Sequence, residues 1–143
     1  MRFVTACLSL ILLVCAACNS KKTLFTKLEA SATGIEFNNE LKESDALNVL
    51  DISNIYNGGG VGIGDVNGDS LADIYFTGNK VSNKLYLNKG ALHFEDITSV
   101  AGVEGEGKWS RGVSVVDINN DGKSDILHNF NLVVKKAEIV AIK

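Results

Sequence analysis

A duplicated acidic segment, flanked by glycine and β-branched residues, constrains the fold of this chain more than any other feature. Gly60–Ile74 (GVGIGDVNGDSLADI) aligns without gaps with Gly112–Ile126 (GVSVVDINNDGKSDI), which lies 52 positions later. Repeated units of this length stack on their neighbours to bury their apolar faces. Short β-prone runs flank each acidic stretch, so each stretch is expected to connect one strand to the next.

The acidic stretches have the spacing of a cation-binding loop. In each copy, oxygen-bearing side chains occupy loop positions 1, 3, 5 and 9, and the backbone carbonyl at position 7 adds a further oxygen. Hard oxygen donors in a flexible loop favour Ca²⁺ over Zn²⁺ or copper, and Mg²⁺ ranks second because it needs a stricter octahedron. We therefore predict about two structural Ca²⁺ ions. The predicted ligands are Asp65, Asn67, Asp69, Leu71 and Asp73 in the first loop, and Asp117, Asn119, Asp121, Lys123 and Asp125 in the second.

An interpretation without metal stays open, because loops rich in Asp and Asn also occur as simple Asx turns. Two copies with matching flanks and three carboxylates each favour the cation site. Without a cation, crowded carboxylates are expected to raise each other's pKa. Position 6 is Gly122 in the second loop but Ser70 in the first. If that position needs a positive φ, the serine adds roughly 1 kcal/mol of strain, which predicts a weaker first site.

The loops differ from EF-hand and dockerin loops, which need an acidic residue at position 12 and a following helix. Position 12 is Phe76 in the first loop and His128 in the second. The whole pattern instead resembles the FG-GAP and VCBS repeats, the calcium-loop blades of integrin-α-like β-propellers. The segments that carry the resemblance, beside the loops, are Asn57–Gly60, Asn83–Gly90, Phe94–Thr98 and Trp109–Gly112. The likeness extends from about Leu24 to Ile126 and is strongest to bacterial lipoproteins that carry an ASPIC/UnbV domain, which would lie beyond this chain.

The resemblance implies an all-β fold, a partial β-propeller of about two blades that follows a cleaved signal helix. It also implies adhesion to, or recognition of, proteins or glycans, with calcium in a structural role and no enzymatic activity. The alternatives left open are a fragment of a periplasmic or outer-membrane hydrolase or glycan-processing protein whose catalytic part is absent, and a non-functional truncation.

The N-terminus has the pattern of a secretory signal. Arg2 precedes the apolar run Phe3–Ala17, which is shorter than the roughly 20 residues that span a bilayer. Small residues before Cys18 resemble a bacterial lipoprotein signal, so Cys18 is the predicted lipidation site; cleavage after Ala17 without lipidation is the alternative. The three cysteines, Cys7, Cys15 and Cys18, all lie in or next to this leader, and a body without thiols suits an oxidising compartment.

These features give a domain plan with too few blades for a ring. The plan is a signal peptide at 1–17, a polar tether at 18–23 and a β-repeat region at 24–143, with repeats near 54–105 and 106–143 and the second one incomplete. Removing 17 of the 143 residues leaves 126, about 2.4 lengths of the 52-residue repeat, whereas propellers close with about 4 to 8 blades. We therefore expect a truncated form of a longer protein; a chain that pairs with other chains as an oligomer and a small standalone sheet are the alternatives.

Charge and motifs exclude other functions. A net charge of -3 and an isoelectric point near 5.3 argue against a nucleic-acid binder that relies on phosphate neutralisation. The sequence has no Gly-x-Ser-x-Gly elbow and no His-Glu-x-x-His motif. Trp109 is expected to pack in a core or between blades, and His93 and His128 are expected to be structural or surface residues. The expected location is extracytoplasmic, lipid-anchored in the bacterial cell envelope, at the outer membrane.

Overall fold

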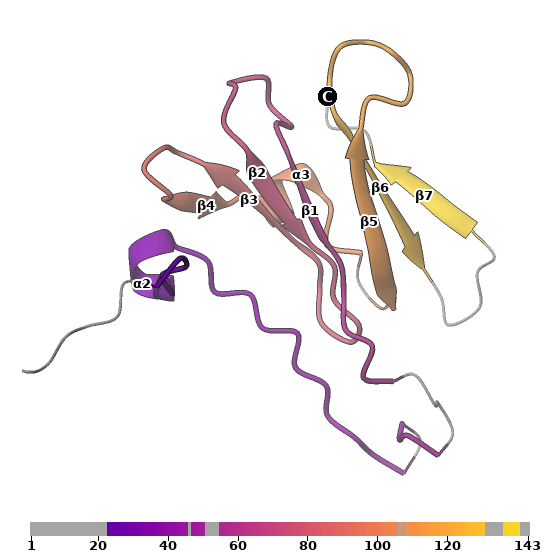
Figure 1. Ribbon diagram of the computed structural model, residues 1–143. Helices are drawn as coiled ribbons and strands as arrows, with labels where there is room; N and C mark the ends of the chain where they lie inside the picture. The colour runs from indigo at the N-terminus through magenta and orange to yellow at the C-terminus, as the bar shows by residue number, and fades with distance from the viewer. Residues whose placement is uncertain are drawn as a thin grey trace, which may run out of the picture.

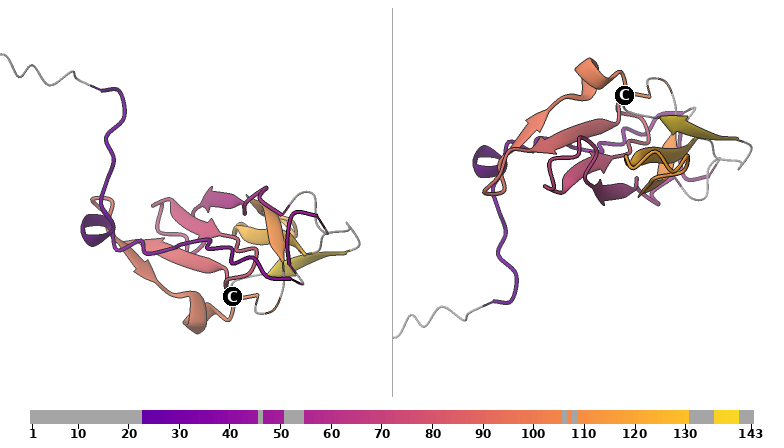
Figure 2. Two further views of the ribbon diagram at one scale, coloured as in Figure 1. Left: turned by 90° about the horizontal axis from the view of Figure 1, so that it is seen from below. Right: turned by 90° about the horizontal axis from the view of Figure 1, so that it is seen from above.

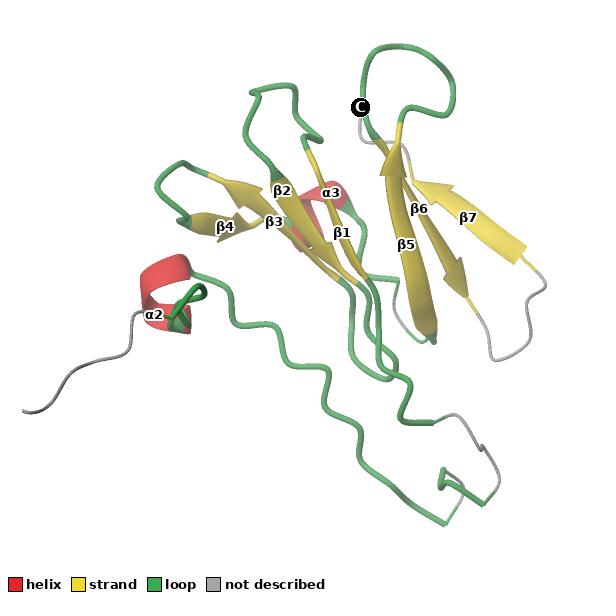
Figure 3. Ribbon diagram, viewed as in Figure 1, coloured by secondary structure: helices red, strands yellow, loops and turns green. Residues whose placement is uncertain are grey.

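Two antiparallel sheets dominate the computed structural model, which describes residues 23–45, 47–50, 55–105, 107, 109–130 and 136–140. The first sheet contains β1 (Val61–Gly64), β2 (Asp73–Phe76), β3 (Lys84–Asn88) and β4 (Phe94–Asp96) in that spatial order. The second contains β5 (Ser110–Val116), β6 (Asp125–Phe130) and β7 (Lys136–Val140), also in sequence order (Figures 1 and 3). Two short helices are described, α2 (Ala30–Thr33) and α3 (Thr98–Ala101).

Each sheet begins with a hairpin that is closed by one of the acidic loops. Gly64 pairs with Asp73 at the end of β1 and β2, and Val116 pairs with Asp125 at the end of β5 and β6. The two loops project from the same end of the molecule (Figure 1). The prediction that they connect strand to strand is therefore confirmed.

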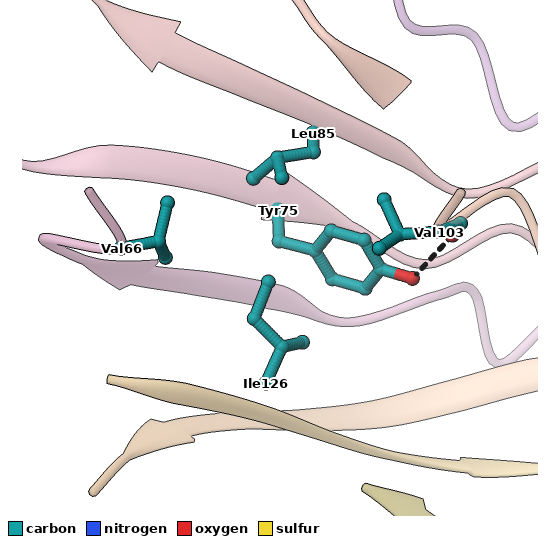
Figure 4. Packing of buried hydrophobic residues seen from close by; sticks show 5 residues of the cluster. All are labelled: Val66, Tyr75, Leu85, Val103 and Ile126. Atoms are coloured by element: carbon teal, nitrogen blue, oxygen red, sulfur yellow. Dashed lines mark hydrogen bonds between the residues drawn. The ribbon is translucent and has the colours of Figure 1, made fainter. Parts of the chain in front are cut away.

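The core lies between the two sheets. Tyr75 and Leu85 of the first sheet and Ile126 of the second are at most 1% exposed, and Val66 and Val103 complete the cluster (Figure 4). The Tyr75 hydroxyl donates a hydrogen bond to the Val103 carbonyl at 2.9 Å. Aliphatic side chains alternate along the strands, so one side of each sheet supplies this core while the other side points away from it.

Glycine allows the two sheets to approach at β1 and β5. A Cβ atom built on Gly62 would lie 2.9 Å from Val115 Cγ2 and 3.0 Å from Val113 Cγ2. Carbon atoms in ordinary contact are about 3.5 to 4.0 Å apart. A side chain at this position therefore has no room unless the valines move, which explains the glycine spacing in β1.

The N-terminal segment crosses the opposite side of the first sheet. Phe37 stacks on Phe76 with ring centroids 4.9 Å apart, and Phe76 contacts Tyr86 edge-on. The Glu36 N–H donates to the Tyr86 hydroxyl at 3.3 Å. Figure 2 shows this segment extending along the sheet from α2. Its contacts fix it over β2 and β3 rather than over β1.

The prediction of an all-β, partial propeller-like fold is confirmed: the structure is built from antiparallel sheets and forms no closed ring in the described part of the chain. The tail after the second loop contributes β7. The signal peptide, most of the tether and Cys7, Cys15 and Cys18 lie outside the described residues, so these predictions stay as they were. No helix of the described part is long and apolar enough to cross a membrane.

Candidate calcium loops

The two acidic loops share six internal hydrogen bonds, and the first loop adds one from the Gly68 N–H to the Asp65 carboxylate. In both, the position 1 carboxylate accepts the N–H groups of positions 5 and 6, and the position 9 carboxylate accepts that of position 2. The position 3 amide oxygen accepts the position 5 N–H, and its NH₂ group donates to the position 5 carboxylate, which also accepts the position 7 N–H. These bonds are 2.8 to 3.2 Å long in the first loop and 2.8 to 3.1 Å in the second.

The carboxylate at position 9 lies at the base of each loop. Asp73 is 1% exposed, and its two oxygens accept the N–H groups of Val66 at 2.9 Å and Asn88 at 2.8 Å. Asp125 is buried in the same way and accepts the Ile118 N–H. Position 9 therefore anchors the loop to its sheet, and in the first repeat it also reaches β3 through Asn88.

The structure brings the other predicted side chains together at the loop surface. Asp65 and Asp117 are partly buried, whereas Asn67, Asp69, Asn119 and Asp121 are exposed. Leu71 and Lys123 direct their backbone N–H groups to the position 5 carboxylates at 2.8 and 2.9 Å. The interpretation as Asx turns describes these bonds as well, since each loop is held by its own side-chain-to-backbone contacts.

The expected rise in carboxylate pKa is wrong for Asp65. Its pKa is lowered below the ordinary value, chiefly because the Ser70 N–H donates to its carboxylate, with further N–H bonds from Gly68 and Asp69. Hydrogen bonds to the charged form outweigh the partial burial that would raise the pKa of this carboxylate. The loop therefore keeps Asp65 ionised by means of its own backbone.

Backbone strain is divided differently between the two loops. Ser70 at position 6 has φ +68°, and its counterpart Gly122 has φ +85°, so this position does need the left-handed region. Position 4 is also left-handed, with Gly68 at φ +82° and Asn120 at φ +59°. Each loop thus contains one glycine and one strained residue, and Asn tolerates this region better than Ser.

The donor types fit a hard cation. Carboxylate and amide oxygens are the ligands that Ca²⁺ prefers, and an oxygen that accepts one N–H retains a second lone pair. In Asp65 this applies to Oδ2, which accepts the Ser70 N–H, because Oδ1 accepts two N–H groups. In the described residues, no three His, Cys, Asp or Glu side chains already form a compact metal-binding group. The side chains that would hold an ion are Asp65, Asn67, Asp69 and Asp73, and in the second loop Asp117, Asn119, Asp121 and Asp125. The backbone carbonyls of Leu71 and Lys123 remain the predicted ligands at position 7.

The residues outside the loops mostly have packing roles. Trp109 is 8% exposed and lies 6.0 Å from the Arg111 guanidinium, measured to the ring centroid. His128 is buried against Tyr75 with ring centroids 5.7 Å apart, whereas His93 is exposed. The prediction of a packing role for Trp109 and a structural one for His128 is confirmed by this burial.

Sequence reasoning missed the polar residues that join the two sheets at the end away from the loops. Thr77 Oγ1 donates to the Arg111 carbonyl at 2.9 Å, and Asn79 Nδ2 donates to the Ser110 carbonyl at 3.1 Å. Thr77 and Asn79 lie just beyond β2, where a polar residue gives no signal that distinguishes it from an ordinary turn residue. Only the position of β5 shows their role.

Comparison with known proteins agrees with the repeat. The family model for the FG-GAP-like repeat matches residues 65–128, from the first residue of one loop to just beyond the other. Cartilage acidic protein 1 of Xenopus tropicalis is 39% identical over 80 residues, and that of Homo sapiens is 38% identical over 78 residues. These alignments cover 54% and 53% of this chain but only 12% of each relative's length. The prediction of an FG-GAP-like repeat is therefore confirmed for the segment that contains both loops.

Proposed function

We propose that this chain is a calcium-binding β-repeat module, anchored to a membrane through lipidated Cys18, that binds protein or glycan ligands outside the cytoplasm. The observation that carries the proposal is the hydrogen-bond pattern that the two loops share, with the same types of oxygen-bearing side chain at the same positions. The FG-GAP-like match, which spans both loops, supports it. Relatives named for cartilage support a location outside the cytoplasm.

Calcium would act on structure rather than on chemistry. A bound ion supplies positive charge to three carboxylates in each loop. The buried Asp73 and Asp125 connect the loop to its sheet, so order in the loop is transmitted to the first hairpin of each repeat. The exposed residues at positions 3 and 5 remain at the surface, next to solvent and any ligand.

Titration calorimetry of the purified chain with Ca²⁺ tests the metal proposal. We expect two sites, of which Asp121→Ala removes one and Asp69→Ala removes the other. Asp45→Ala is the matched control, because Asp45 is an exposed aspartate outside both loops. If the heats of injection are the same with Ca²⁺ and with chelator, and the same in both loop variants, the calcium proposal is wrong. The loops are then Asx turns without a metal.

Lipid labelling tests the anchor. When the chain is expressed in bacteria fed with labelled palmitate, we expect the label on the protein and its loss in Cys18→Ser. Cys15→Ser is the control, since Cys15 lies in the apolar run that would be removed. Labelling that survives Cys18→Ser would contradict lipidation at this residue.

Ligand binding is tested with immobilised chain on panels of glycans and matrix proteins, with Ca²⁺ and with chelator. Calcium-dependent retention of a ligand supports the proposed role, and retention of none opposes it.

The shifted carboxyl pKa values of the described residues, those of Asp65 and Asp96, are both lowered. The hydrolase alternative predicts a deep pocket that holds a carboxylic acid with a raised pKa outside the two loops.

A further inference from the structure

Each repeat has two different faces, and in the described part of the chain the two sheets pack on each other through one face of each. We call one side of the first hairpin of each repeat the rear face, which is the side where β1 carries its glycines. It comprises Gly60, Gly62, Gly64, Val66 and Tyr75 in the first repeat, and Gly112, Ser114, Val116, Ile118 and Leu127 in the second. The opposite side is the front face: Val61, Ile63, Ile74 and Phe76 in the first repeat, and Val113, Val115, Ile126 and His128 in the second.

The internal interface joins the rear face of the first repeat to the front face of the second. Glycine against valine is the central contact, since a Cβ on Gly64 would lie 2.6 Å from Val115 Cγ1 and one on Gly62 2.9 Å from Val115 Cγ2. Val66 and Ile126 close the interface on its loop side as members of the core cluster. The interface shows how a rear face fits a front face.

The same positions are exposed on the two outer faces. On the front face of the first repeat, Val61 is 55% and Ile63 64% exposed, whereas their counterparts Val113 and Val115 pack against the core. On the rear face of the second repeat, Ile118 is 45% exposed, whereas its counterpart Val66 is 5% exposed. Aliphatic residues that are buried at the internal interface thus have exposed counterparts on the two outer faces.

The N-terminal segment covers only the outer part of the open front face. Phe37 stacks on Phe76, much as Tyr75 contacts His128, the counterpart of Phe76, at the internal interface. Val61 and Ile63 on β1 stay exposed beside this contact. The uncovered strip, Val61 and Ile63, therefore corresponds to Val113 and Val115, which pack against the glycines of β1 at the internal interface.

We propose that a second copy of this chain docks the rear face of its second repeat on the front face of the first repeat, head to tail. Gly112 then takes the place of Gly60 and Ser114 that of Gly62, so small residues again face aliphatic ones. Each copy carries one face of each kind, which makes the contact heterologous and able to continue from copy to copy. Because Ser114 and Val116 replace glycines, the copies approach less closely than the internal repeats do, and the contact is weaker.

Mixing of single-face variants tests the direction of docking. The full chain is kept dispersed by a non-ionic detergent in Ca²⁺ buffer and followed by sedimentation velocity up to about 100 µM, where an interface of ordinary size associates. Ile63→Asp spoils only the front face and Ser114→Arg only the rear face. Each variant is expected to associate at least about tenfold more weakly, the loss expected when a buried aliphatic contact is removed, while their mixture forms a 1:1 dimer that grows no further. Val100→Asp, at a 93% exposed residue of α3, is the control.

The sedimentation results show whether a second copy docks at all and whether it docks head to tail. A wild-type chain that stays monomeric throughout this range overturns the proposal, as does association that neither variant weakens. A mixture in which both variants remain monomeric overturns the head-to-tail arrangement, because only that arrangement leaves one intact pair of faces.

Disulfide trapping gives a second, independent readout in case a charged variant fails to fold. In a chain with Cys7, Cys15 and Cys18 changed to Ser, Ile63→Cys is mixed with Ser114→Cys under mild oxidation. These positions correspond to Val115 and Gly62, which meet at the internal interface. We expect a crosslinked dimer in the mixture and little in either variant alone. Equal crosslinking of Ile63→Cys with itself would show a symmetric dimer and overturn the proposal.

Discussion

Replacing Gly62 by alanine tests whether the close contact of β1 with β5 governs the stability of the molecule. The new Cβ would lie 2.9 Å from Val115 Cγ2 and 3.0 Å from Val113 Cγ2, roughly 0.6 Å inside ordinary contact. Overpacking of this kind costs about 1 to 3 kcal/mol. Alanine also restricts the unfolded chain, which returns about 0.4 to 1 kcal/mol. We therefore expect a net loss of about 1 to 2 kcal/mol in the free energy of unfolding.

Urea unfolding followed by Trp109 fluorescence measures this loss, because Trp109 is the single tryptophan and is buried. With an m-value of about 1 to 3 kcal/mol per molar, the midpoint should fall by about 0.5 to 1 M. Ser114→Ala is the matched control, since Ser114 is the counterpart of Gly62 on an exposed face and already carries a Cβ.

A double-mutant cycle identifies the cause. Val115→Ala removes the nearest methyl group that the new Cβ would meet, whereas Val113 Cγ2 at 3.0 Å remains, so Gly62→Ala should cost clearly less in that background. An unchanged midpoint for Gly62→Ala would refute the reasoning. So would an equal loss with and without Val115, because the contact with valine would then not be the origin of the effect.

Three further predictions concern the loops and the core. Asp96→Asn should lower stability by about 0.5 to 1 kcal/mol, since the Lys84–Asp96 pair at 2.7 Å is about one third exposed. Burial tends to raise the pKa of Asp96, but hydrogen bonds from Lys84 and Thr98 outweigh it and lower the pKa. The stabilisation by the pair is therefore present above the unfolded pKa of Asp96 and is lost as the pH falls through the folded pKa. The thermal unfolding temperatures of wild type and variant should converge in acid. Tyr75→Phe should cost about 1 kcal/mol in urea unfolding, because the buried Val103 carbonyl loses its donor. Tyr56→Phe should change little, because the bond from its hydroxyl to Glu43 lies at the exposed surface. Ser70→Gly should stabilise by about 1 kcal/mol and Gly122→Ala should destabilise by a similar amount, since both residues have positive φ; equal melting temperatures for the two variants would contradict the strain argument.

The sequence by itself determined the hairpins and the loop contents. Alternating aliphatic residues on both sides of a repeated Asp-x-Asn-x-Asp stretch predict strand, loop and strand, because side-chain alternation and turn-forming residues act over a few neighbours. The need for a left-handed residue at position 6 was also visible, through Gly122 and the contrasting Ser70. These features depend on local geometry, which repeats wherever the sequence repeats.

Only the tertiary structure decided which copies of a position are buried. Val66 and Ile118 occupy the same place in their repeats, yet Val66 lies in the core and Ile118 is 45% exposed, because within the described residues the first repeat has a sheet behind it and the second does not. The lowered pKa of Asp65 depends likewise on where the backbone N–H groups point, and the contact of Phe37 with Phe76 joins segments 39 residues apart. Burial, electrostatic environment and long-range contacts are set by which surfaces meet, and a repeated sequence leaves that choice to the packing of the repeats.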